Sequence, residues 1–107
     1  MSYTQFQDYL DNNGFTYSVK DDIVETMKSL IMRSMLATRK ILDPQKRRGC
    51  FELFGYDFIL DEDFNTWLIE VNTNPCIEES SKILKVLIPR MLDDMLKLSV
   101  DQYFNDF

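Results

Sequence analysis

The sequence predicts a small α+β domain, in which an antiparallel β-hairpin is covered by helices. Two segments with helical periodicity come first, and two strand-like segments rich in aromatic and β-branched residues follow them. A further helical segment closes the chain. This order favours a strand pair covered by helices over an all-helical or all-β arrangement. Of the 107 residues, 45% are hydrophobic, which is enough for one modest core.

Two helices are expected in the N-terminal part of the chain. Residues 4–14 are typical of a short helix that Thr4 caps. Residues 21–42 form the clearest helix, with Asp21 or Asp22 at its start. Its apolar positions recur with a period of about 3.6 residues. They predict a face toward the core, made of Ile23, Met27, Leu30, Ile31, Ser34, Met35, Thr38, Ile41 and Leu42.

Two strands and a last helical region complete the chain. Residues 50–60 predict a strand of about ten residues, and residues 66–72 predict the strand that returns beside it. After an irregular loop, Ser80 or Ser81 can cap a helix. Because proline disrupts a helix interior, we expect a kink or a new helix at Pro89.

The composition argues against several classes of function. A net charge of −6 disfavours nonspecific nucleic-acid binding, and no apolar run is long enough to span a membrane. The first residues do not resemble a signal peptide, so a cytosolic location is expected, with Cys50 and Cys76 as free thiols. The absence of histidine excludes histidine-based nucleophile pairs and metal sites, and leaves oxygen ligands for a hard cation such as Mg²⁺.

The two predicted strands bring three polar side chains together. With a four-residue turn, Asp61 pairs with Thr66, and this register sets Asp57 opposite Glu70. Facing residues of an antiparallel pair have Cβ atoms roughly 4.5–5.5 Å apart and point to the same side. Because side chains alternate along a strand, Asn72 shares the side of Glu70.

Such a trio can hold a divalent cation. Two carboxylates at this distance repel each other, a cation removes the conflict, and an amide oxygen completes the set without adding charge. The other face, with Ile59, Ile69 and Val71, suits a core. The spacing alone leaves open that the polar side chains are simply solvated, and a register slip of one residue would separate them.

The segment FELFGYDFILDEDFNTWLIEVNTNP, residues 51–75, resembles the C-terminal ATP-grasp segment of the tubulin–tyrosine ligase family, which includes tubulin polyglutamylases and polyglycylases. FELFGYDF followed by WLIEVN has the residue types and the spacing that are typical of the family. The N-terminal FQDYLDNNG with its following helix, and the later LIPRMLDDMLKLSVDQYF, are also similar to family sequences. The resemblance therefore covers nearly the whole chain.

The resemblance implies that residues 1–107 are the C-terminal portion of an ATP-grasp domain. Its function would be to attach tyrosine, glutamate or glycine to tubulin through an acyl phosphate, with ATP as substrate and Mg²⁺ as cofactor. The family's metal ligands, which also contact the nucleotide through the metal, carry over to Asp57, Glu70 and Asn72; no further catalytic side chain is assigned. The implied partners are tubulin tails, ATP and the amino acid, without nucleic acid or membrane. The implied location is the cytoplasm, on microtubules, with cilia as one candidate.

Several points stay open at the level of sequence. The family's nucleotide-binding lysines and phosphate-covering loop have no counterpart in this chain, so we expect a portion of a larger ligase that is inactive alone. Another ATP-grasp carboxylate–amine ligase and a noncatalytic interaction module are the alternatives. The basic run 46–48 is either a solvated loop or a contact for acidic tubulin tails. The sequence does not specify the amino acid, the tubulin subunit, initiation or elongation, or the oligomeric state.

Overall fold

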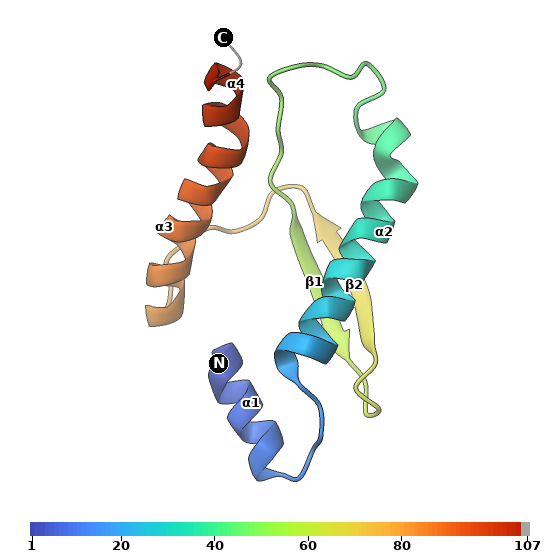
Figure 1. The fold of residues 1–107 in the computed structure, drawn as a ribbon, viewed down its shortest axis with the longest axis vertical. Coiled ribbons are helices and arrows are strands. Elements are labelled where there is room, and N and C mark those ends of the chain that lie inside the picture. Colours follow the sequence, from blue (N-terminus) through green and yellow to red (C-terminus); the bar gives the residue numbers. More distant parts are fainter. Residues whose placement is uncertain (106–107) are drawn as a thin grey trace. The chain divides into compact units, whose positions relative to one another are not determined.

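A computed structural model describes residues 1–105, which divide into two compact units. The first unit comprises residues 1–44 and 56–72, and the second comprises residues 45–55 and the chain from residue 73 onward. The elements follow one another as helix, helix, strand, strand and helix (Figure 1), which confirms the predicted α+β class.

The first helix, α1 (Tyr3–Asn12), begins one residue earlier than predicted. Ser2 caps it: the Gln5 N–H donates to Ser2 Oγ at 3.1 Å, and the Ser2 N–H donates to Gln5 Oε1 at 2.8 Å. This is a capping box, in which a serine and a glutamine three residues apart satisfy each other's backbone N–H. Thr4 was therefore the wrong cap, because Ser2 has the required partner three residues later.

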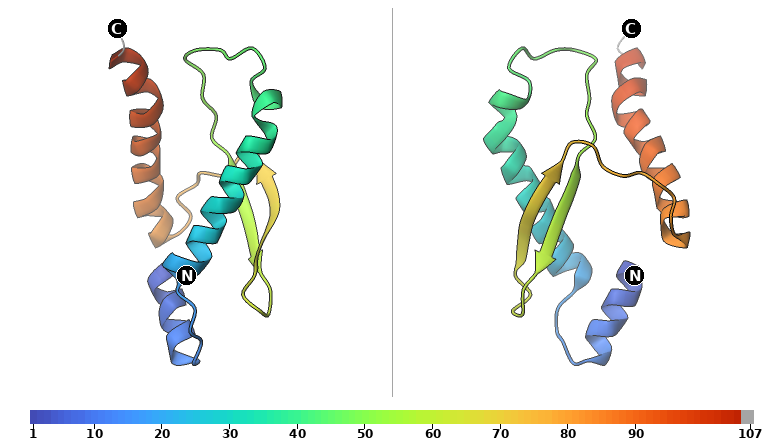
Figure 2. Two further views of the ribbon diagram at one scale, coloured as in Figure 1. Left: turned by 45° about the vertical axis from the view of Figure 1, so that its right-hand side comes forward. Right: turned by 180° about the vertical axis from the view of Figure 1, so that it is seen from behind.

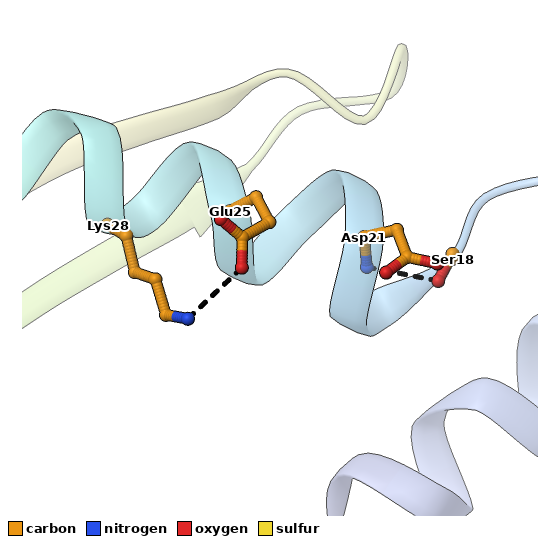
Figure 3. A network of polar contacts seen from close by, with 4 residues as sticks. All are labelled: Ser18, Asp21, Glu25 and Lys28. Carbon is orange, nitrogen blue, oxygen red and sulfur yellow. Dashed lines mark hydrogen bonds and ion pairs between the residues drawn. The ribbon is translucent and has the colours of Figure 1, made fainter.

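The long helix begins with a π-helical segment, η1 (Val19–Val24), and continues as α2 (Glu25–Leu42). The two aspartates predicted at its start lie in its first turn. Ser18 is the cap, and its Oγ accepts the Asp21 N–H at 3.1 Å (Figure 3). One turn further on, Lys28 and Glu25 form an exposed ion pair of 3.0 Å, which contributes little to stability.

The hairpin consists of β1 (Gly55–Leu60) and β2 (Thr66–Asn72), and α2 lies along one of its faces (Figures 1 and 2). The Ser34 hydroxyl on α2 and the Tyr56 hydroxyl on β1 are 2.7 Å apart. β1 is shorter than predicted because residues 50–54 form no strand. Among residues 1–105 the sheet has two strands, and β2 ends at Asn72, so within this part of the chain residues 50–54 have no strand to pair with.

The core of the first unit is small. Leu10, Val19 and Ile23 are buried, and partly buried side chains pack around them: Phe6, Val24, Met27, Leu60 and Phe64. The predicted apolar face of the long helix is at least partly buried from Ile23 to Met35. The prediction is wrong for its last three positions, Thr38, Ile41 and Leu42, which are exposed.

The second unit contains α3 (Lys82–Leu96), the π-helical η2 (Lys97–Asp101) and α4 (Gln102–Asn105). Ser81 caps α3 and accepts the Leu84 N–H at 3.2 Å, as one of the two predicted caps. The helix runs through Pro89 without ending, so of the two expected outcomes, a kink or a new helix, the new helix does not occur. No helix in residues 1–105 combines the length and the apolar character needed to cross a membrane.

Candidate metal centre

The hairpin turn differs from the predicted one. The Asp61 N–H donates to the Asn65 carbonyl at 3.1 Å, and the Phe64 N–H donates to the Asp61 carbonyl at 3.0 Å. Asp61 therefore pairs with Asn65, and the predicted pairing with Thr66 is wrong. A three-residue loop of this kind needs a residue with positive φ at its end, and Phe64 supplies it at φ 60°.

The two strands differ in length. β1 has six residues and β2 has seven, although each strand has only the other as its partner. Because a regular ladder gives each residue one partner, the additional residue in β2 indicates a β-bulge. The burial pattern changes within β2: partly buried and exposed residues alternate up to Ile69, and the three residues that follow are also exposed.

The position of this bulge decides which residue faces Asp57. Counted from the turn, the regular register sets Asp57 opposite Ile69, and both line the same open cavity of about 700 Å³. An additional residue located before Glu70 would instead set Asp57 opposite Glu70. The pairing of the two carboxylates remains a prediction.

The predicted apolar face is not a core. Ile59, Ile69 and Val71 are 56%, 59% and 40% exposed. Ile59 is two residues from Asp57 and therefore shares the face of that carboxylate. The side of β1 that points toward α2 instead presents Tyr56, whose hydroxyl contacts Ser34. The predicted division into a polar face and an apolar core face was therefore wrong, because Asp57 and Ile59 lie on the same face of β1.

Glu70 and Asn72 lie together on β2. The Asn72 Nδ2 donates to Glu70 Oε1 at 3.4 Å, and both residues are exposed, as is Asp57 on β1. Two carboxylates and an amide oxygen are the ligand types that Mg²⁺ prefers. Within residues 1–105, no three His, Cys, Asp or Glu side chains form a metal-binding group, so a site here needs an amide ligand such as Asn72. The metal-binding role of the trio remains a prediction.

The hydrogen bonds of Asp61 were not predicted from the sequence. Its carboxylate accepts hydrogen bonds from Asp63, Asn65 and Trp67 across the turn. The hydrogen bond from the Trp67 indole is the main cause that lowers the pKa of Asp61 below its ordinary value of 3.8. The sequence signal was the position of Asp61 at the end of a strand, since aspartate commonly bonds the backbone of a following turn.

Comparison with known proteins shows the family to which this α+β chain belongs. The chain belongs to the tubulin–tyrosine ligase family, because the family model described as Tubulin-tyrosine ligase family matches residues 1–106. This confirms the resemblance of the sequence.

Three relatives illustrate the family. The human "Protein monoglycylase TTLL8" is 34% identical over 99 residues, which cover 92% of this chain and 11% of the relative. "Tubulin glycylase 3D" of Tetrahymena thermophila is 38% identical over 89 residues, 83% of this chain and 8% of the relative. "Probable tubulin polyglutamylase TTLL9" of Bos taurus is 32% identical over 94 residues, 88% of this chain and 20% of the relative. The chain thus spans a fifth or less of the length of these relatives, and no solved structure matches it.

Proposed function

We propose that this chain is part of an ATP-dependent ligase that attaches an amino acid to tubulin, and that its hairpin holds Mg²⁺ through Asp57, Glu70 and Asn72. Family membership and the names of the glycylase and polyglutamylase relatives support the reaction class. The observation that supports the metal site most is the seventh residue of β2, since it allows Asp57 to face Glu70.

The proposed reaction has two steps. A carboxylate oxygen takes the γ-phosphoryl group of ATP, and ADP leaves. The amino group of the second substrate then attacks the acyl phosphate carbon, the new C–N bond forms, and inorganic phosphate leaves with the former carboxylate oxygen. When bound, Mg²⁺ would offset the negative charge of the transferring phosphoryl group.

The three side chains have distinct tasks in this proposal. Asp57 and Glu70 supply two negative charges, which match the double positive charge of the cation. Asn72 adds an oxygen without further charge. Its amide nitrogen, rather than its oxygen, points to Glu70 at 3.4 Å, so binding requires the carboxamide to rotate. All three residues are exposed, so a cation can reach them from solvent.

Other elements of the ligase would complete the nucleotide site. We therefore expect the isolated chain neither to bind ATP tightly nor to turn over. Glycine and glutamate are the amino acids to test first, because the named relatives are glycylases and a polyglutamylase. Tubulin tails would be the acceptor, and the ligase would act in the cytoplasm on microtubules, with cilia as one site of action.

The test is Glu70→Gln in the ligase that contains this hairpin. Incorporation of labelled glycine, glutamate or tyrosine into tubulin is measured with Mg²⁺ and ATP. We expect the variant to lose activity by at least about 100-fold, because a direct ligand should matter no less than the groups that support one. Glu62→Gln, an exposed carboxylate in the turn, is the matched control and should retain activity. Unchanged ligation by the Glu70 variant would remove this residue from the mechanism.

A further inference from the structure

The Asp61 side chain connects the end of β1 to the start of β2. Its Oδ1 accepts the backbone N–H of Asp63 at 2.9 Å and that of Asn65 at 2.8 Å. Its Oδ2 accepts Asn65 Nδ2 at 3.0 Å and the Trp67 Nε1 at 2.9 Å. One exposed carboxylate thus accepts four hydrogen bonds, one from within its own turn and three from residues just beyond it.

These bonds determine the length of the loop. The Asp61 main-chain carbonyl accepts the N–H of Phe64, and the side chain accepts the N–H of Asn65. The Asp61 carboxylate therefore takes the place of the Asp61 main-chain carbonyl as the acceptor for Asn65, because that carbonyl is already bonded to Phe64. With both groups occupied, the loop is held at three residues and Asp61 is held opposite Asn65.

The backbone of the loop is strained, so the loop needs the hydrogen bonds of Asp61 to be stable. Phe64 has a positive φ of 60°, a conformation that is strained for a bulky residue. Its ring stacks on Tyr17 with 4.5 Å between the ring centroids, and the Tyr17 hydroxyl donates to the Asp63 carbonyl at 3.3 Å. The turn is therefore held from two sides, by the Asp61 carboxylate within the hairpin and by Tyr17 from the segment before η1.

The register that the turn sets decides which face Asp57 occupies relative to Glu70. A shift of one residue in the pairing moves every side chain of a strand to the opposite face. β2 has one residue more than β1. If this residue precedes Glu70, as the proposed site requires, the two carboxylates face each other only when the turn pairs Asp61 with Asn65. A longer turn combined with the same bulge would place Asp57 and Glu70 out of register.

We propose that Asp61 is a positioning residue of the metal site: by fixing the three-residue turn, it keeps the Asp57 carboxylate across from Glu70. Asp61 does not contact the metal in this proposal, which rests on the proposed function for the identity of the site. A purely stabilising role would lower the stability of the turn without changing the pairing of Asp57 with Glu70.

The test compares Asp61→Ala with the wild-type chain by NMR, using Mn²⁺ alone as the probe. Two readouts are used. The first is the cross-strand nuclear Overhauser effect (NOE) between Asp57 and Glu70. The second is the Mn²⁺ concentration at which paramagnetic broadening halves the intensity of the Asp57 signals. We expect the variant to lose the NOE and to need about tenfold more Mn²⁺ at Asp57, as when a group that supports a ligand is removed. Asp63→Asn is the control, because the Asp63 backbone rather than its carboxylate bonds Asp61.

The outcomes separate the two proposals. An intact NOE and an unchanged Mn²⁺ response in Asp61→Ala would overturn the role of Asp61. Absence of broadening at Asp57, Glu70 and Asn72 in the wild-type chain would instead overturn the metal site, and the NOE alone would then decide about Asp61. Should Asp61→Ala unfold the hairpin, Asp61→Asn replaces it, because this variant retains Oδ1 for the backbone N–H groups of Asp63 and Asn65 but cannot accept from Trp67. Since Oδ1 fixes the turn in this proposal, Asp61→Asn should keep the NOE and the Mn²⁺ response of Asp57. Loss of the NOE in this variant while the hairpin stays folded would overturn the inference.

Discussion

At the scale of single residues, the sequence singles out candidate ligands but not the side chains that surround them. Asp57, Glu70 and Asn72 were predicted from residue type and spacing, and their binding of a metal remains a prediction. The caps were harder. Ser18 precedes two aspartates that fit the same role, and only the fold decides which side chain reaches a free backbone N–H.

Asp61 gives a prediction for the dependence of the turn on pH. Its pKa is lowered below 3.8, first by the hydrogen bond from Trp67, so the ionised form is favoured by the folded turn. A carboxylate whose pKa is lowered by folding stabilises the folded state at pH values above its ordinary pKa. This stabilisation is lost as the pH falls through the lowered pKa of the folded state. We therefore expect the bond from Trp67 to break only below pH 3.8.

The measurement is the indole N–H chemical shift of Trp67, followed by NMR during acid titration. Trp67 is the single tryptophan of the chain, so its signal is unambiguous. In Asp61→Asn the shift should be independent of pH over the same range. A wild-type transition centred above pH 3.8 would contradict the lowered pKa.

At the scale of elements, the sequence predicted which segments are helices and strands but not how they end. The predicted strand 50–60 is rich in aromatic and branched residues along its whole length, yet only Gly55–Leu60 pairs, because pairing depends on where β2 ends. The bulge in β2 could not be predicted either, since WLIEV is equally compatible with a regular strand. Continuous apolar runs carry no alternation that would reveal an extra residue.

The contact between α1 and the long helix gives a second prediction. Leu10 is fully buried and belongs to a core with only two other buried side chains, Val19 and Ile23. Replacing Leu10 with alanine should lower the free energy of unfolding by about 2–5 kcal/mol, the usual cost of removing a buried leucine. In so small a core, we expect this to unfold the first unit near room temperature.

Urea denaturation followed by far-UV circular dichroism measures this effect. Tyr9→Ala is the neighbouring control, because Tyr9 is 52% exposed and its replacement should change stability by no more than about 0.5 kcal/mol. Equal stabilities of the two variants would contradict the assignment of Leu10 to the core.

At the scale of the whole molecule, the apolar surface of the hairpin is notable. Trp67 is 59% exposed, as is Ile69, on the strand that carries Glu70 and Asn72. The sequence correctly predicted an apolar hairpin but assigned Ile59, Ile69 and Val71 to a core. A pattern of apolar residues indicates that a face avoids water without indicating which part of a protein covers it.

The central claim is that Asp57, Glu70 and Asn72 together hold a divalent cation. Mn²⁺ titration of the isotope-labelled chain tests it most directly, because paramagnetic broadening reports on the residues nearest the ion and needs neither ATP nor tubulin. We predict that the signals of these three residues broaden first and together, and that Glu70→Gln removes the effect at all three. Broadening that begins at Glu78, Glu79 or the Asp93–Asp94 pair, with the hairpin signals unchanged, would contradict the account.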